Sequence, residues 1–167
     1  PEVLDFADTH NKIILRADTG KGKTTAFIRY FNNHRPTARL LILAPLTIIV
    51  DQYQKTYGDT VVFLTGSSDG FEHERSFSSN IVFSTYEQGI KHLAGQCFDY
   101  VVIDEIHQLL TANCFKADVI ADLTILIKNN KTIGLTGTPA QIFKKLDFKL
   151  LDVDIKQPKS RNIEVRY

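Results

Sequence analysis

Six short runs rich in valine, isoleucine and leucine constrain the fold of this 167-residue chain more than any other feature. The runs are KIILR, RLLILAP, TVVFLTG, NIVFST, DYVVIDE and KTIGLTG, which begin at residues 12, 39, 60, 80, 99 and 131. Apolar and polar residues do not alternate within them, so strands formed from these runs would be covered on both faces. That arrangement is typical of a parallel sheet in an α/β protein.

Segments with helix-compatible patterns separate the runs, at residues 22–33, 47–56, 87–95, 116–128 and 140–146. Strands that alternate with helices predict an α/β domain, with a mostly parallel sheet and helices on both faces. The polar segment 67–80 has no clear period, and we interpret it as a surface loop. We expect one domain over residues 1–155. Residues 156–167 form an exit linker or, because NIEVRY alternates, a last strand.

Composition excludes several classes of protein. No apolar run approaches the ~20 residues of a membrane-spanning helix, and no secretory signal opens the chain. Neither Cys97 nor Cys114 belongs to a zinc-binding spacing, which favours a cytoplasmic, nucleoplasmic or viral intracellular location over secretion. The net charge of +1 argues against bulk electrostatic binding of nucleic acid, but not against a groove of amides and hydroxyls. The chain has no methionine, even at position 1, so we expect a piece of a longer protein or a processed product.

The sequence ADTGKGKT, residues 17–24, lies between the first run and the first helix. It fits the phosphate-loop pattern G-x-x-x-x-G-K-[ST], with alanine in the first position. Gly20 and Gly22 allow backbone N–H groups to converge on a phosphate, Lys23 would reach the β- and γ-phosphates, and Thr24 would ligate Mg²⁺. The alternative is a glycine turn with solvated lysines. We predict a nucleotide-binding loop that contains Thr19, Gly20, Lys21, Gly22, Lys23, Thr24 and Thr25.

Two carboxylates follow the fifth run directly, in the sequence VVIDEIH. Asp104 is placed to hold Mg²⁺, and Glu105 to orient or deprotonate an attacking water. Adjacent carboxylates at a buried edge repel each other unless a cation or hydrogen bonds are present. The alternative is a helix N-terminus, where acidic side chains favour the helix dipole.

Five segments appear in a recognisable order: ADTGKGKTT, LAPLTIIVDQ, FSTYEQG, VVIDEIH and GLTGTP. Together they resemble motifs I, Ia, Ib, II and III of the superfamily 2 DExH/D-box helicases, over roughly residues 12–140. The resemblance implies a RecA-like P-loop NTPase domain, the first motor domain of a helicase, which uses ATP and Mg²⁺. It also implies that Lys23, Asp104, Glu105 and His107 are catalytic, and that Thr24 and Asp104 hold the metal.

Motif III is implied to couple ATP to the nucleic acid. Thr136 and Thr138 stand where the hydroxyls of motif III lie in this family, and His107 is expected to contact them. Gly137 and Pro139 also make a tight turn, and a histidine at a helix start is common, so purely structural roles remain open.

Contacts with nucleic acid are implied for three further segments at strand ends. Motif Ia lacks the arginine that many relatives carry here. Thr47 is alternatively an N-cap, Ser84 to Glu87 alternatively a capping box, and residues 64–68 alternatively a plain turn. The residues predicted to contact nucleic acid are Pro45, Leu46, Thr47, Gly66, Ser84, Thr85 and Tyr86.

The family divides its motor between two RecA-like domains, and motifs IV to VI with their arginines are not in this sequence. The glutamine of the adenine-reading Q motif is not visible either. We therefore expect nucleotide binding, weak or no hydrolysis and no unwinding by this chain alone. The partners implied are a second RecA-like domain and a nucleic acid, DNA or RNA, with no membrane. A duplex translocase or ATPase switch of the origin-binding or restriction type, and an inactive nucleotide-binding module, remain as alternatives.

Overall fold

The computed structural model describes residues 1–16, 22–45, 47–111, 117–137, 147–153 and 163–166. Within these residues the chain forms one eight-stranded sheet in the order β3-β4-β2-β5-β6-β1-β7-β8. Neighbouring strands from β3 to β7 are parallel, and β8 pairs antiparallel with β7. The strands are β1 (Lys12–Arg16), β2 (Leu40–Ala44), β3 (Val62–Leu64), β4 (Ile81–Thr85), β5 (Tyr100–Ile103), β6 (Lys131–Thr136), β7 (Lys149–Val153) and β8 (Ile163–Arg166).

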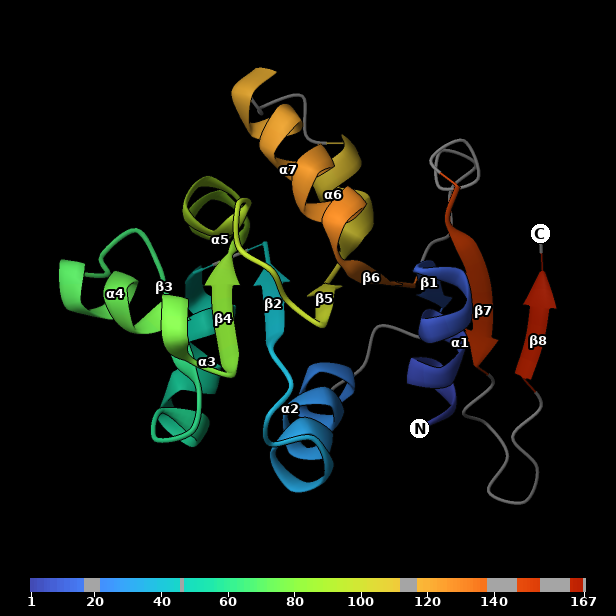
Figure 1. Cartoon of the computed structure of the whole chain (residues 1–167), viewed down its shortest axis with the longest axis horizontal. Coiled ribbons are helices and arrows are strands. Elements are labelled where there is room, and N and C mark those ends of the chain that lie inside the picture. Colours follow the sequence, from blue (N-terminus) through green and yellow to red (C-terminus); the bar gives the residue numbers. More distant parts are fainter. Residues whose placement is uncertain (17–21, 46, 112–116, 138–146, 154–162, 167) are drawn as a thin grey trace.

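Helices cover both faces of this sheet, which confirms the predicted fold class (Figure 1). They are α1 (Glu2–His10), α2 (Lys23–His34), α3 (Thr47–Tyr57), α4 (Gly70–Ser78), α5 (Tyr86–Leu93), α6 (Ile106–Thr111) and α7 (Ala117–Asn129). Successive residues of a strand point to opposite faces, so each strand serves two apolar layers. Ile42 packs in the layer of α1, α2 and α3, whereas its neighbours Leu41 and Leu43 pack in the layer of α5, α6 and α7.

All six predicted strands are present, and four of the five predicted helices begin and end within two residues of the expected limits. The fifth, 140–146, lies outside the described residues. Residues 163–166 form a strand, the second of the two options for the C-terminal segment. Helix α1 and strand β7 have no counterpart among the predicted elements. Among the described residues, no helix is both long and apolar enough to cross a membrane.

The interpretation of residues 67–80 as a surface loop is wrong, because most of that segment is helix α4. Asp69 caps the helix by accepting from the Glu72 backbone N–H at 2.9 Å, and the Glu72 carboxylate accepts from the Asp69 N–H at 3.1 Å. Phe71 and Phe77 are both exposed, so the large apolar residues of this helix do not mark a buried face. The D-x-x-E capping box is the signal that identifies it.

Candidate active site

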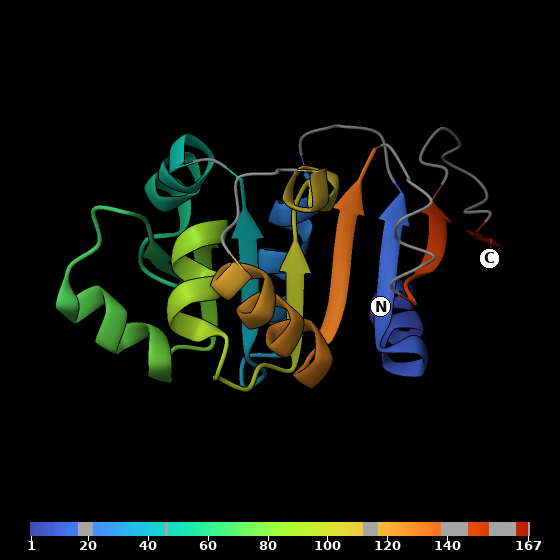
Figure 2. The ribbon, with the colours of Figure 1, turned by 90° about the horizontal axis from the view of Figure 1, so that it is seen from above.

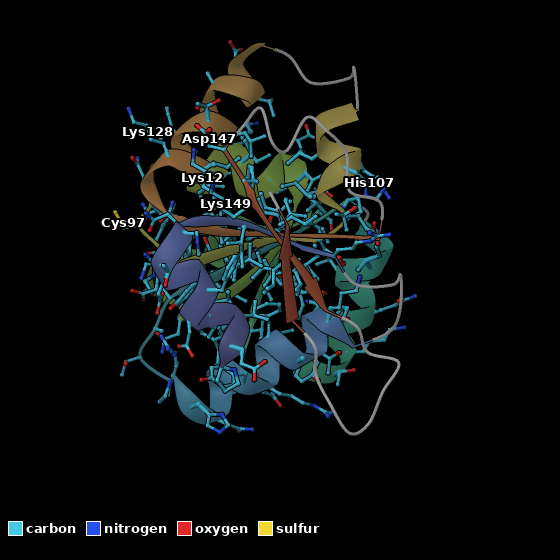
Figure 3. The ribbon with its side chains drawn as sticks, turned by 90° about the vertical axis from the view of Figure 1, so that its right-hand side faces the viewer. Lys12, Cys97, His107, Lys128, Asp147 and Lys149 are labelled. Atoms are coloured by element: carbon cyan, nitrogen blue, oxygen red, sulfur yellow. The ribbon has the colours of Figure 1, made fainter. Side chains whose placement is uncertain are left out.

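The topology brings motifs I, II and III to one edge of the sheet. Strands β1, β6 and β5 are neighbours, and the residues that follow their carboxyl ends meet there. Figure 2 shows these strands in parallel, with their arrowheads pointing to the same edge. In Figure 3, His107 lies at one end of the domain, and Lys12 and Lys149, which begin β1 and β7, lie at the other. The carboxyl edge of an open α/β sheet is the usual ligand site of such folds.

Motif I meets motif II at a carboxyl group. Thr24, in the first turn of α2, is buried, and its side chain lies close enough to Asp104, which follows β5, to lower the pKa of that carboxyl. Lys23 lies close enough to act on the same carboxylate electrostatically. Three further members of the predicted loop, Thr19, Gly20 and Lys21, lie outside the described residues.

Several neighbouring groups change the pKa of the Asp104 carboxyl in opposite directions. Burial raises its pKa, and the neighbouring Glu105 charge raises it further. Lys23, the Glu105 backbone N–H and the Thr24 side chain act in the opposite direction, and the N–H lies 3.1 Å from Oδ1. The net effect is a raised pKa, as expected of a buried carboxylate whose charge is only partly compensated. A cation bound here would complete that compensation.

The residues present fit a magnesium-bound triphosphate. Mg²⁺ prefers oxygen ligands, and a threonine hydroxyl with an aspartate carboxylate is the ligand pair used in P-loop NTPases. Gly22, which precedes α2, has a φ of 131°, a conformation that side-chain-bearing residues rarely adopt. Among the described residues nothing lies within 4 Å of where its Cβ would be. The start of α2 is suited to bind a phosphate, because the first-turn amides of a helix have no partner within the helix.

Glu105 is in a backbone conformation that glutamate rarely adopts. Its φ is 49°, in the left-handed region that costs a non-glycine residue about 1–2 kcal/mol. Such conformations persist where the surroundings fix them, and they often occur at functional sites. The Tyr86 hydroxyl donates to the backbone carbonyl of Asp104 and lies 3.0 Å from that of Glu105. The sequence gives no sign of either feature.

His107 connects the Glu105 carboxylate to motif III. Its Nδ1 lies 3.0 Å from the Thr136 hydroxyl, at the end of β6, and 3.3 Å from the Glu105 carboxylate. A hydrogen on Nδ1 would let His107 donate to either oxygen, because carboxylate and hydroxyl oxygens both accept hydrogen bonds. The structure thus brings together Glu105, His107 and Thr136, whereas Thr138 lies outside the described residues.

Ser84, Thr85 and Tyr86, which are predicted to contact nucleic acid, lie within the packed domain. All three side chains are buried, with Ser84 fully inaccessible and Tyr86 6% exposed. The Ser84 hydroxyl donates to the Thr85 carbonyl at 3.0 Å. The capping box considered for this segment is absent, because Thr85 is the N-cap of α5 and its side chain makes no capping bond. Ser84 and Thr85 end β4 and Tyr86 begins α5, and burial leaves little of these side chains exposed to a ligand at the surface.

The other residues predicted to contact nucleic acid differ in exposure. Gly66 is exposed, at a turn after β3 in which the Thr65 N–H donates to the Ser68 hydroxyl at 2.9 Å. Pro45 is half-buried after β2, and Thr47 begins α3. Leu46 lies outside the described residues.

Thr25, assigned to the nucleotide loop, contacts a different helix. Its hydroxyl donates to the Tyr53 hydroxyl of α3 at 3.4 Å. Helix α3 follows motif Ia, so this bond joins the first turn of α2 to the helix that begins at Thr47. Tyr53 was not among the residues predicted for the site, because contacts between helices leave no local pattern in the sequence.

A parallel α/β sheet that sets a phosphate-loop lysine and threonine against two carboxylates defines a RecA-like P-loop domain. The family model for DEAD/DEAH box helicase matches residues 2–146. The chain therefore belongs to the DEAD/DEAH box helicase family, as its motifs predicted. A search among curated proteins finds no match.

Solved structures of helicases share the fold. The UvsW helicase from bacteriophage T4 is 17% identical, with a TM-score of 0.59 over 89% of this chain and 57% of that one. A DEAD box protein from Methanococcus jannaschii is 18% identical, with a TM-score of 0.65 over 90% and 47%. The Sulfolobus solfataricus SWI2/SNF2 ATPase core, solved in complex with dsDNA, is 21% identical, with a TM-score of 0.54 over 88% and 33%. The chain thus spans 33–57% of the length of these proteins.

Proposed function

We propose that this chain is the first motor domain of an ATP-dependent nucleic-acid helicase or translocase. It binds Mg²⁺-ATP at the carboxyl edge of the sheet and contacts a nucleic-acid backbone along the same edge. The observation that carries the proposal is the approach of the buried Thr24 side chain and of Lys23 to the Asp104 carboxyl, because it brings the two candidate metal ligands and the phosphate-loop lysine together. Membership of the DEAD/DEAH box helicase family supports the same assignment.

Four side chains have separate roles in nucleotide binding and hydrolysis. Lys23 binds the β- and γ-phosphates, and Thr24 with Asp104 would hold Mg²⁺, which supplies charge neutralisation for the phosphates. Glu105 receives the proton of the attacking water. His107 lies between Glu105 and Thr136, so a change at motif III reaches the base through a single imidazole.

A second RecA-like domain is part of this proposal, since the chain covers only part of the length of the solved helicases. In related NTPases an arginine supplied to the γ-phosphate is worth about 10³–10⁵ in rate. Without that arginine we expect this domain to bind nucleotide and to hydrolyse it slowly or not at all. Pro45, Thr47 and Gly66 are the remaining candidates for backbone contacts with DNA or RNA.

A titration with fluorescent ADP, with and without Mg²⁺, tests nucleotide binding directly. Lys23→Ala should lower the affinity by roughly tenfold to a hundredfold, the loss expected for charge-assisted hydrogen bonds to a phosphate. Lys91→Ala, which removes an exposed lysine of α5, should leave the affinity unchanged. Wild-type protein that binds no nucleotide, or equal affinities in all three proteins, contradicts the proposal.

Substitutions of the two carboxylates distinguish nucleotide binding from hydrolysis. Asp104→Asn should weaken only the Mg²⁺-dependent part of nucleotide binding, whereas the Glu105→Gln variant should bind nucleotide as the wild type does. In a protein that also carries the second RecA-like domain, Glu105→Gln should abolish ATP hydrolysis. Stimulation of that activity by single strands rather than duplex distinguishes a helicase from a duplex translocase. Small, equal effects of both substitutions would show that the pair is only a helix start.

A further inference from the structure

Tyr86 occupies an unusual place between two motifs. It is the first residue of α5, directly after β4, and only 6% of its side chain is exposed. Its ring belongs to the apolar cluster that also contains Ile103 and Ile106, the residues on either side of the two site carboxylates. A tyrosine buried to this extent needs a partner for its hydroxyl. Here the partner is the backbone of motif II.

The hydroxyl contacts two successive peptide groups. The Asp104 carbonyl belongs to the peptide that precedes the Glu105 Cα, and the Glu105 carbonyl belongs to the peptide that follows it. Tyr86 donates to the first and lies 3.0 Å from the second. Since φ and ψ of Glu105 describe how these two peptides turn about its Cα, one hydroxyl restrains both angles.

That restraint acts where the backbone needs it. Glu105 has a φ of 49°, which is unfavourable for any residue with a side chain. The turn is short, because β5 ends at Ile103 and α6 begins at Ile106. The Asp104 N–H makes the last backbone hydrogen bond between this segment and β2, to the Leu43 carbonyl at 2.8 Å. Beyond Asp104, hydrogen bonds to β2 no longer fix the backbone.

We propose that the Tyr86 hydroxyl is a positioning group for the metal- and water-binding carboxylates of motif II. It holds Glu105 in the left-handed conformation, and with it the Asp104 side chain, whose Oδ1 accepts from the Glu105 N–H at 3.1 Å. This inference rests on the proposed function of the same site. It assigns Tyr86 to the nucleotide side of the domain and not to the nucleic acid.

The protonation of Tyr86 suits this role. Burial raises its pKa, and the nearby Asp104 and Glu105 charges raise it further. The phenol therefore remains protonated at neutral pH and keeps the hydrogen that it donates to the Asp104 carbonyl.

The chain contains a matched control in Tyr100. This tyrosine begins β5, the strand that ends before Asp104, and it is 2% exposed. Its hydroxyl donates to Asp8 at 2.6 Å and accepts from Arg35 at 3.1 Å, at the opposite end of the sheet. Tyr86→Phe and Tyr100→Phe each remove one hydroxyl from a buried phenol, but only the first touches motif II.

The test measures how much Mg²⁺ tightens the binding of fluorescent ADP to the wild type and to each variant. Tyr86→Phe should reduce the Mg²⁺-dependent gain in affinity by about threefold to tenfold, as expected for one lost hydrogen bond. Tyr86→Phe should bind ADP without Mg²⁺ as tightly as the wild type does. Tyr100→Phe should match the wild type in ADP affinity both with and without Mg²⁺. An unchanged gain in Tyr86→Phe, or an equal loss in both variants, overturns the proposal.

A second measurement needs no nucleotide. In the ligand-free protein, the amide NMR signals of Glu105 and Ile106 should shift or broaden in Tyr86→Phe and not in Tyr100→Phe. Unchanged signals overturn the positioning role, whatever the nucleotide does. Shifted signals together with a wild type that binds no nucleotide would leave the restraint in place and contradict the proposed function instead.

Discussion

The Nδ1 of His107 lies 3.0 Å from the hydroxyl of Thr136, and this contact joins motif II to motif III. Thr136 is fully buried at the end of β6, where its hydroxyl is positioned by the strand. The contact between the histidine and the threonine is therefore part of the folded domain itself. Because His107 also lies 3.3 Å from Glu105, we expect a displacement of β6 to reach the Glu105 carboxylate.

Thr136→Val should remove this coupling while it keeps the shape of the side chain. We expect unchanged ADP affinity, together with a loss of the effect that an ATP analogue has on oligonucleotide affinity, since coupling between sites is reciprocal. Fluorescence anisotropy of a labelled oligonucleotide, with and without the analogue, measures this effect. Thr132→Val is the matched control, because Thr132 is equally buried on the same strand and its hydroxyl donates to the Asn130 carbonyl at 3.2 Å. If the ATP analogue changes oligonucleotide affinity equally in the two variants, the contact between His107 and Thr136 only stabilises the fold.

Asp104→Asn should stabilise the ligand-free domain at neutral pH. The pKa of Asp104 is raised in the folded protein, chiefly by burial, so the folded state binds more protons than the unfolded state above the ordinary value of 3.8. Stability is then lost as the pH rises from 3.8 through the raised pKa. Asparagine keeps an acceptor oxygen and carries no charge, so it avoids that loss.

Urea unfolding in Mg²⁺-free buffer across this pH range measures the effect. The variant should be more stable than the wild type at pH 7, and the difference should disappear below pH 3.8. Asp51→Asn, at an exposed position of α3, should show no such pH-dependent difference. A variant that is less stable than the wild type at pH 7 would show that hydrogen bonds to the carboxylate outweigh its burial.

Gly134→Ala should destabilise the domain through motif II. A Cβ at this position of β6 would lie 2.7 Å from Cδ1 of Ile14 and 2.8 Å from Cδ1 of Ile106. Overpacking of this kind costs about 1–3 kcal/mol of unfolding free energy. Ile106 follows Glu105 directly, so its displacement moves the site.

A double-mutant cycle locates the strain. Ile106→Val removes the crowded Cδ1, so it should cost less in the Gly134→Ala background than in the wild type, where Ile→Val costs about 0.5–1.5 kcal/mol. Gly70→Ala is the control, because nothing described lies within 4 Å of its Cβ position. Additive losses would place the strain at Ile14.

The sequence predicts the elements of this fold better than it predicts the contacts between them. The strands are recognisable because burial on both faces forces continuous apolar runs, as in Leu40–Ala44, where all five residues are buried. Helix α4 is not, because it lies at the edge of the domain with two exposed phenylalanines. Short polar helices of this kind depend on capping and on tertiary contacts that have no period in the sequence.

The same division applies to the site. Motif spacing predicts that Lys23, Asp104 and Glu105 meet, because parallel strands place their carboxyl ends at one edge. It does not predict that the Tyr86 side chain turns inward or that Glu105 adopts a positive φ. Both depend on how α5 packs against the sheet, and the residues that are hydrogen-bonded there are 18 and 19 positions apart in the chain.

Gly66 offers a direct test of the proposed nucleic-acid edge. It is exposed after β3, and nothing described lies within 4 Å of its Cβ position, so Gly66→Glu should fold normally. A carboxylate there would repel a phosphate bound along the carboxyl edge of the sheet. Gly95→Glu is the matched control, because Gly95 is equally open but lies between α5 and β5, at the opposite edge.

The wild-type domain should bind a single-stranded oligonucleotide weakly and with little sequence preference, since amide and hydroxyl contacts read the backbone and not the bases. With a net charge of +1, few counterions are released, and the salt dependence should correspond to about two or three phosphates. Fluorescence anisotropy over a salt series measures both quantities. Gly66→Glu should weaken binding severalfold, most at low salt where charge repulsion is least screened, whereas Gly95→Glu should bind as the wild type does. Equal weakening by the two substitutions would show a general effect of charge, and no weakening by Gly66→Glu would place the strand on another surface.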